Sequence, residues 1–181
     1  MFSSKKNLEN FLNNNKFKKI FVLVGKKSYK LSGAEKIFSK LLKNKITKYF
    51  YKISPYPEIY ELKKIIISLR KFSPDLIIAV GGGSVLDYAK VANVVEICPN
   101  FNKRISNNTY PIKKRLAELV AIPTTAGSGA EVTSNAVIYI NKIKYSVEDN
   151  LIKPNYFFLL PELVINSSKN IKSSAGFDVI A

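Results

Sequence analysis

The chain has 181 residues, of which 46% are hydrophobic, so it is long enough to bury the core of one domain. It carries 29 basic and 13 acidic residues, a net charge of +16, and its lysines are scattered along the whole sequence, which favours a solvated basic surface over a nucleic-acid patch. The sequence contains a single cysteine, no run of ~20 apolar residues, and no apolar core in its basic first 19 residues. These features exclude a disulfide framework, a membrane-spanning helix and a secretory signal, and we expect a cytoplasmic protein.

Short apolar runs alternate with helical patterns in the first half of the chain. The expected elements, in order, are strand 20–24, helix 32–43, strand 46–51, helix 58–71 and strand 76–80. A glycine turn at Gly25 follows the first strand. This alternation predicts an α/β fold with a parallel sheet and right-handed crossovers.

The stretch AVGGGSVLDYAK at 79–90 places three glycines between an apolar strand and a helical pattern, with Ser84 expected as the N-cap. Such a turn directs backbone N–H groups and the positive end of a helix dipole toward one spot, which suits a diphosphate. It matches neither G-x-G-x-x-G nor the P-loop pattern. A tight turn that only packs the helix against the strand is the structural alternative.

A second glycine-rich loop follows the strand expected at 119–122. Its sequence, PTTAGSGAE at 123–131, begins just past the carboxyl end of that strand, where open α/β sheets place their ligands. The segment 98–114 before it is polar and expected to be irregular. The remaining expected elements are strands 135–140 and 144–147 as a hairpin, strand 156–160, and a helix from Ser167 to Ala181.

Three motifs together closely resemble the iron-containing alcohol dehydrogenase family. They are GGGSVLDYAK at 81–90, PTTAGSGAEVT at 123–133 and SSAGFDVIA at 173–181, and the similarity runs from Ile20 to the last residue. The resemblance implies a Rossmann-like parallel sheet with flanking helices, followed by the first turns of an all-α domain that is missing here. The expected division is therefore a dinucleotide-binding domain at residues 1–166 and the start of a helical metal-binding domain at 167–181.

The resemblance also assigns cofactor-binding residues. In the family, the glycine turn holds the pyrophosphate of NAD or NADP, an aspartate and a lysine of the next helix line the cofactor cleft, and the threonine-rich loop contacts the dinucleotide. The matching residues are Gly81, Gly82, Gly83, Ser84, Asp87, Lys90, Thr124, Thr125, Thr133 and Lys144. Structural roles remain the alternative, namely a first-turn charge and a surface lysine on the helix, and threonines that only satisfy loop backbone groups.

The family transfers a hydride between an alcohol carbon and the nicotinamide while a divalent metal, iron or zinc, polarises the oxygen. The metal is held by one aspartate, which matches Asp178, and three histidines. This sequence contains no histidine, so it cannot supply the imidazole ligands. We assign no catalytic residue and expect an N-terminal fragment that is inactive alone.

Two departures from the family pattern lie near the expected cofactor. Lys26 and Lys27 stand where members that prefer NAD often carry an aspartate, so NADP is favoured over NAD. Tyr56 stands where many members have an asparagine, which removes a polar contact.

Three other functions stay open: a relative acting on glycerol or of the dehydroquinate synthase type, a nucleotide-binding module without catalysis, and a nucleic-acid binder that rests on charge alone. As partners we expect a small-molecule alcohol or aldehyde, no specific nucleic acid and no membrane, with a homo-oligomer left open. The sequence does not identify the substrate.

Overall fold

A computed structural model describes residues 4–112 and 114–165. The strands are β1 (Lys19–Gly25), β2 (Ile46–Lys52), β3 (Leu76–Gly81), β4 (Glu118–Pro123), β5 (Asn135–Ile140), β6 (Ile143–Glu148) and β7 (Tyr156–Phe157). The helices are α1 (Lys5–Asn14), α2 (Ser28–Leu31), α3 (Ala34–Leu41), α4 (Ile59–Phe72), α5 (Gly83–Val94), α6 (Phe101–Ser106) and α7 (Pro161–Ile165), with a 3₁₀ helix η1 (Asn150–Ile152). No helix in this part of the chain is long and apolar enough to cross a bilayer.

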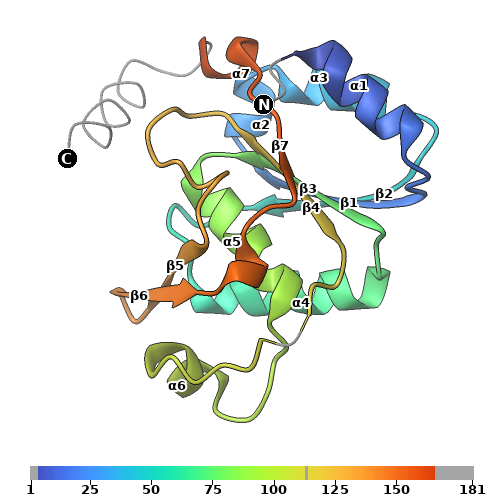
Figure 1. Cartoon of the computed structure of the whole chain (residues 1–181). Helices are drawn as coiled ribbons and strands as arrows, with labels where there is room; N and C mark the ends of the chain where they lie inside the picture. The colour runs from blue at the N-terminus through green and yellow to red at the C-terminus, as the bar shows by residue number, and fades with distance from the viewer. Residues whose placement is uncertain (1–3, 113, 166–181) are drawn as a thin grey trace.

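Five parallel strands form the central sheet in the order β2-β1-β3-β4-β7 (Figure 1). The register pairs Gly25 with Lys52 and Gly81 with Pro123, so neighbouring strands end at the same edge. The predicted Rossmann-like parallel sheet is confirmed. The expected boundary between residues 166 and 167 and the helix beyond it lie outside the described residues.

Helices cover both faces of the sheet (Figure 1). Ile20, Val22 and Val24 of β1 pack in a cluster with α1, α3 and α7, whereas Phe21 and Leu23 pack in a second cluster with α4 and α5. Because successive side chains of a strand point to opposite faces, a strand covered on both sides must be apolar throughout. This explains the continuous apolar runs that predicted the strands.

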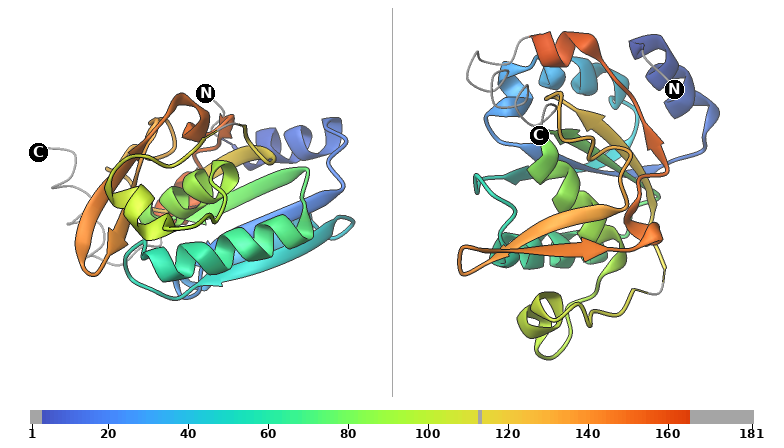
Figure 2. Two further views of the ribbon diagram at one scale, coloured as in Figure 1. Left: turned by 90° about the horizontal axis from the view of Figure 1, so that it is seen from below. Right: turned by 60° about the vertical axis from the view of Figure 1, so that its left-hand side comes forward.

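Helix α5 lies between the sheet and the β5–β6 hairpin, which crosses its outer side (Figure 2). Nearly all of its side chains are buried, including the polar residues Lys90 and Asn93. The hairpin turns at Asn141 and Lys142, whose φ angles of 49° and 67° fit a two-residue turn with positive φ at both central positions. The predicted hairpin is therefore confirmed, with its second strand beginning one residue earlier.

Helix α1 was not expected from the sequence. Ser4 caps it by accepting a hydrogen bond from the Asn7 amide, and Leu8 and Leu12, one turn apart, are buried against the sheet. The many asparagines and lysines around these two leucines hide the amphipathic pattern.

Three further elements differ from their expected bounds. The helix expected at 32–43 corresponds to α3 alone, and the short helix α2 before it was not predicted; Gly33, with φ 82°, separates the two because the chain there adopts a left-handed conformation that interrupts a helix. Helix α6 lies within the segment expected to be irregular, where Phe101 and Ile105 are buried. Strand β7 pairs with β4 through only two residues, which is shorter than the run 156–160 suggested.

Helix α5 begins two residues earlier than an N-cap at Ser84 would place its start. The N-cap is Gly82 and Ser84 is the second residue of the helix, so the expectation for Ser84 was wrong. A Cβ atom on Gly81 would lie 2.5 Å from Cγ2 and 2.7 Å from Cβ of Val85. The absence of a side chain at Gly81 is therefore required for packing of α5 against β3.

We predict that Gly81→Ala lowers the free energy of unfolding by about 1–3 kcal/mol, because its new methyl group meets the Val85 Cβ, which cannot move away without the backbone. Gly82→Ala is the matched control, since its Cβ would come no closer than 3.3 Å to Thr125. Urea unfolding of both variants measures the difference. Equal losses of stability in the two variants would contradict this account.

Candidate functional site

The strand order places β1 and β3 side by side, while β2 and β4 lie outside them in opposite directions. The connection after β1 therefore runs to one side of the sheet and the connection after β3 runs to the other. Between these two connections a crevice opens at the carboxyl ends of β1 and β3. Gly25, at the end of β1, is close to the start of α5, because a Cβ on Gly25 would lie 3.7 Å from Val85 Cγ2. The glycine turns after β1 and β3 are thus neighbours at this crevice.

The N-terminus of α5 opens at the same place without a side-chain cap, and its first turn contains no acidic residue. The carbonyl of Gly82 accepts hydrogen bonds from the amides of Val85, at 2.9 Å, and Leu86, at 3.3 Å. The amides of Gly83 and Ser84 precede these and have no acceptor within the helix. Two backbone donors and the positive end of the helix dipole therefore suit an anion at this position.

The threonine-rich loop, residues 124–129, follows β4 and lies against the glycine turn. A Cβ on Gly82 would lie 3.3 Å from Thr125 Oγ1, and one on Gly83 would lie 3.3 Å from Ser128 Oγ. The amide of Thr124, which is buried, donates to the carbonyl of Gly81 at 3.0 Å. The two loops that the sequence singled out therefore meet, and side chains at Gly82 and Gly83 would crowd their junction.

A cavity of about 410 Å³ lies beside this loop. Pro123 and Thr125 line it on the loop side, and Leu160, Val164 and Ile165 line it at the end of the described chain. Its lining is mainly apolar, so it suits a flat ring better than a charged group.

The ammonium group of Lys90 lies inside the protein rather than along an open cleft, because Lys90 has no exposed surface. It donates to the carbonyl of Ala130 at 2.9 Å, to Thr133 Oγ1 at 3.0 Å and to the carbonyl of Asn135. Burial lowers the pKa of Lys90 to about 8, although the nearby carboxylates of Asp87 and Glu131 act to raise it. The structure thus joins two predicted site residues, Lys90 and Thr133, by a direct hydrogen bond.

Asp87 lies one turn before Lys90 and faces the hairpin. Burial raises the pKa of its carboxyl to about 6, while the charge of Lys90, a hydrogen bond from the backbone of Val137 and the charge of Lys144 act to lower it. Asp87, Lys90, Thr133 and Lys144 therefore form a second group on the hairpin side of α5. The first group consists of the glycine turn and the threonine-rich loop at the start of the helix.

The turn after β2, residues 54–57, is held by two buried side chains that the sequence analysis missed. The Glu61 carboxylate accepts hydrogen bonds from the amides of Ile53, at 2.8 Å, and Ser54, at 3.1 Å. Tyr88 donates to the same carboxylate at 3.1 Å. An acidic residue on the otherwise apolar inner face of α4 was the signal that could have identified Glu61.

The described residues do not fit a metal site. They contain no group of three or more histidine, cysteine, aspartate or glutamate side chains that could hold a metal ion. Asp178, the predicted metal ligand, lies outside the described residues, and the whole sequence has no histidine. We therefore derive no chemical step through a metal.

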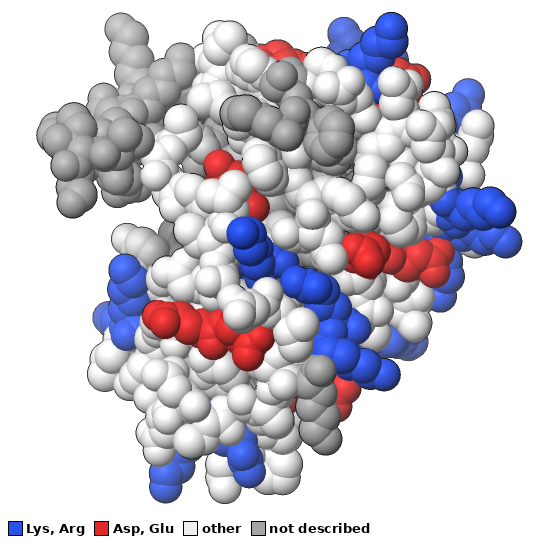
Figure 3. All heavy atoms as spheres, viewed as in Figure 1, with Lys and Arg blue, Asp and Glu red and all other residues white. Residues whose placement is uncertain are grey.

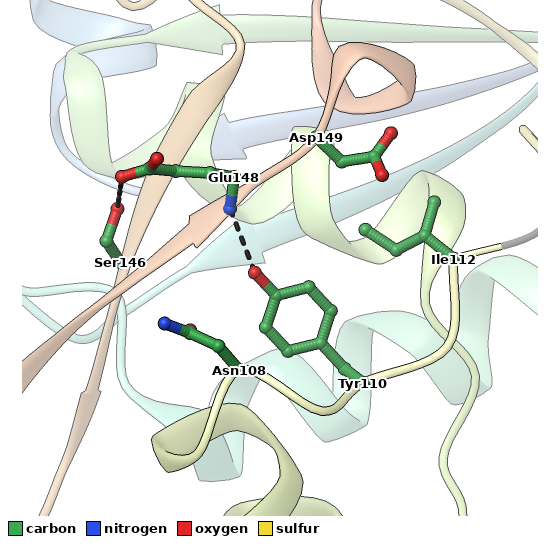
Figure 4. Close-up of a pocket in the computed structure, with 6 residues that line it drawn as sticks. All are labelled: Asn108, Tyr110, Ile112, Ser146, Glu148 and Asp149. Carbon is green, nitrogen blue, oxygen red and sulfur yellow. Dashed lines mark hydrogen bonds between the residues drawn. The ribbon is translucent and has the colours of Figure 1, made fainter.

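A second cavity, of about 400 Å³, lies between the segment after α6 and the end of β6 (Figure 4). Tyr110 points into it and accepts a hydrogen bond from the Glu148 amide at 2.9 Å, while the Glu148 carboxylate accepts one from Ser146 at 2.8 Å. None of the predicted site residues lines this cavity.

Basic side chains occur in many places on the face shown in Figure 3, and a short row crosses its centre with acidic groups beside it. Among the described residues, Arg70 and Glu96 form a salt bridge at 3.3 Å. This mixed distribution is typical of a solvated basic surface.

Comparisons with known proteins place the chain among dehydrogenases. The family described as iron-containing alcohol dehydrogenase matches residues 3–161. An alcohol dehydrogenase of Thermococcus barophilus is 35% identical over 131 residues, which cover 68% of this chain and 34% of that protein. The NADPH-dependent butanol dehydrogenase of Clostridium saccharobutylicum is 32% identical over 175 residues, which cover 93% of this chain and 45% of that protein.

Solved structures agree with this result. The iron-containing alcohol dehydrogenase of Thermococcus thioreducens superposes with a TM-score of 0.83 at 25% identity, covering 98% of this chain and 49% of that one. The chain thus spans between 34% and 49% of the length of these three proteins.

The raised pKa of Asp87 predicts a pH-dependent effect of Asp87→Asn. The folded state binds a proton here more readily than the unfolded state, so the stability from this group is complete below pH 3.8 and is lost as the pH rises through about 6. The variant keeps a neutral side chain, so at pH 7.5 we expect its free energy of unfolding to exceed that of the wild type by about 1–2 kcal/mol. At pH 4 we expect little difference.

Asp75→Asn is the control, because its effect on the free energy of unfolding should have the opposite sign. Hydrogen bonds from the amides of Lys19 and Lys18 lower the pKa of Asp75, so its charged form stabilises the fold, and this contribution is lost as the pH falls. Urea unfolding at both pH values tests the pair. Destabilisation of Asp87→Asn at pH 7.5 would contradict our reading of the Asp87 environment.

Proposed function

The chain belongs to the iron-containing alcohol dehydrogenase family, and from that premise we propose that it forms the dinucleotide-binding domain of an NAD(P)- and metal-dependent oxidoreductase acting on an alcohol or aldehyde. One observation carries the proposal. The uncapped N-terminus of α5 opens at the crevice between β1 and β3, against a second loop rich in glycine and threonine.

The diphosphate would be held by main-chain groups. The amides of Gly83 and Ser84 donate to it, and the dipole of α5 favours its negative charge. Gly82 and Gly83 allow its close approach, because a side chain on Gly82 would fill the space beside Thr125 and one on Gly83 would fill the space beside Ser128. The Thr125 hydroxyl is positioned to donate a further hydrogen bond.

The apolar cavity beside the threonine-rich loop would take one of the flat rings of the dinucleotide. Its mainly apolar lining would pack against the ring, and Thr125 belongs both to this lining and to the border of the glycine turn. The nicotinamide supplies the hydride chemistry when it is bound. Asp87, Thr133 and Lys144 are proposed as side-chain contacts to the cofactor at the hairpin side of α5, and Asp178 as the metal ligand.

The cofactor is proposed to be NADP rather than NAD. Lys26 and Lys27 are exposed just after β1, where their charges can pair with a 2′-phosphate and no carboxylate repels it. The Clostridium saccharobutylicum relative is named as NADPH-dependent, which supports the same choice.

Nucleotide binding without catalysis is the second candidate function. It is favoured by the main-chain anion site at the start of α5, which could hold a nucleotide without any metal ligand. Alcohol-dependent reduction of NADP⁺ by the purified chain would exclude it.

We predict that Gly82→Val weakens NADPH binding at least about tenfold, because the branched side chain blocks the diphosphate at the junction of the two loops. Fluorescence titration measures the affinity, and circular dichroism checks that the sheet is intact. Ser39→Val, on the exposed side of α3, controls for a branched residue on a helix. Normal affinity in a folded Gly82→Val protein would contradict the diphosphate assignment.

We also predict that the wild-type chain binds NADPH at least as tightly as NADH. Replacing Lys26 and Lys27 together by glutamate should weaken NADPH binding about tenfold while changing NADH binding less, because only NADPH carries the 2′-phosphate. Replacing Lys36 and Lys40 together by glutamate, both exposed on α3, controls for the same change in net charge. A clear preference of the wild type for NADH would overturn the cofactor choice.

A further inference from the structure

We propose that Lys90 is a positioning residue for the dinucleotide: its buried ammonium group ties residues 130–135 to α5 and so holds the threonine-rich loop against the glycine turn. This proposal rests on the proposed function and adds a role that differs from direct contact with the cofactor.

The hydrogen bonds of Lys90 match its donor capacity. A lysine ammonium group has three N–H donors, and Lys90 has three acceptors, provided by Ala130, Thr133 and Asn135. Two of these acceptors are backbone carbonyls, so the bonds fix the path of the chain rather than the rotamer of a side chain. If residues 130–135 moved away, a fully buried cation would lose its partners, and that state is strongly unfavourable.

These bonds fix the far end of the threonine-rich loop. Its near end is fixed by the Thr124 amide, which donates to the Gly81 carbonyl at 3.0 Å. Its far end, Gly129, directly precedes Ala130, and the Gly129 carbonyl accepts a hydrogen bond from Val132 within the segment that Lys90 holds. Both ends of the loop are thus tied to the same β3–α5 unit that carries the glycine turn.

The threonine-rich loop depends on these two anchors to keep its conformation. Gly127 and Gly129 have φ angles of 124° and 58°, so the backbone passes through conformations that glycine adopts at little cost and leaves readily. Thr125 and Ser128, which border the glycine turn, lie on this flexible path. Anchoring at both ends therefore sets where the Thr125 hydroxyl lies relative to the diphosphate position.

Direct contact between Lys90 and the dinucleotide is disfavoured by the same geometry. Lys90 has no exposed surface, and its three donors already have acceptors. A ligand oxygen could be bound only by giving up one of these bonds.

If Lys90 holds the loop through its hydrogen bonds, the order of the loop should change when Lys90 loses its proton. A side chain that only fills space would show no such dependence on pH. Asp87 on α5 and Glu131 in the loop face the ammonium group and act to raise its pKa, but burial outweighs them and places it at about 8. A neutral amine donates only two hydrogen bonds, so one of the three acceptors loses its donor above this pH. The loop should loosen, while deprotonation also removes the cost of a buried charge, so the global stability should not fall.

Hydrogen exchange of the chain without nucleotide tests the proposal. In Lys90→Met, we expect exchange of peptides covering residues 124–135 to accelerate at least about tenfold, with β1 and β3 unchanged. NADPH affinity should fall about tenfold. Lys71→Met, which removes an exposed lysine of α4, is the matched control and should change neither quantity. Thr133→Val removes one acceptor and should show a smaller acceleration in the same peptides.

A second test measures the wild-type chain over a series of pH values. After correction for intrinsic exchange, the protection of residues 124–135 and the NADPH affinity should both decrease as the pH rises through about 8, and Lys90→Met should show neither change. If Lys90→Met does not fold, Thr133→Val and this series decide the question.

Unchanged protection of residues 124–135 in Lys90→Met would overturn the proposal. So would a loss of NADPH affinity without a change in that protection, because Lys90 would then act on the nucleotide directly. If the wild type binds neither NADPH nor NADH, the proposed function fails, and the exchange comparison still decides whether Lys90 positions the loop.

Discussion

The burial of most of α5 is the constraint on which the rest of the structure depends. The helix is covered by the sheet on one side and by the β5–β6 hairpin on the other, so each of its polar side chains needs a partner inside the protein (Figure 2). Those partners are connecting segments: Tyr88 bonds to Glu58 in the turn before α4, Lys90 bonds to residues 130–135, and Asn93 bonds to the chain entering β4. One helix therefore positions three connections.

The glycine turn that begins α5 meets two different requirements. Gly81 lacks a side chain because α5 packs directly on β3 through Val85, whereas Gly82 and Gly83 face the threonine-rich loop. Gly81 thus has the structural role, while the diphosphate-binding role of Gly82 and Gly83 stays a prediction. Parallel register brings the turn and the loop to one edge of the sheet, where the helix dipole favours an anion.

Much of the fold was predictable because strands buried on both faces must be continuously apolar. The sequence missed α1, where two leucines one turn apart provide the entire buried face. The meeting of the glycine turn and the threonine-rich loop was predictable, since each directly follows such a strand and parallel strands end at one edge of the sheet. The setting of Lys90 was not predictable, because two of its acceptors are backbone carbonyls, which every residue has. Its position on the helix suggested contact with the cofactor, and only the tertiary arrangement shows that the hairpin side encloses it.

The central claim is that main-chain groups at the start of α5 bind a diphosphate. An NMR titration of the ¹⁵N-labelled chain with NADPH tests it most directly, because each backbone amide reports its own environment. The account predicts that the largest shifts occur at Gly83 and Ser84, with smaller shifts at Thr124 and Thr125. Shifts confined to exposed lysines, with the amides of Gly83 and Ser84 unchanged at saturation, would contradict it.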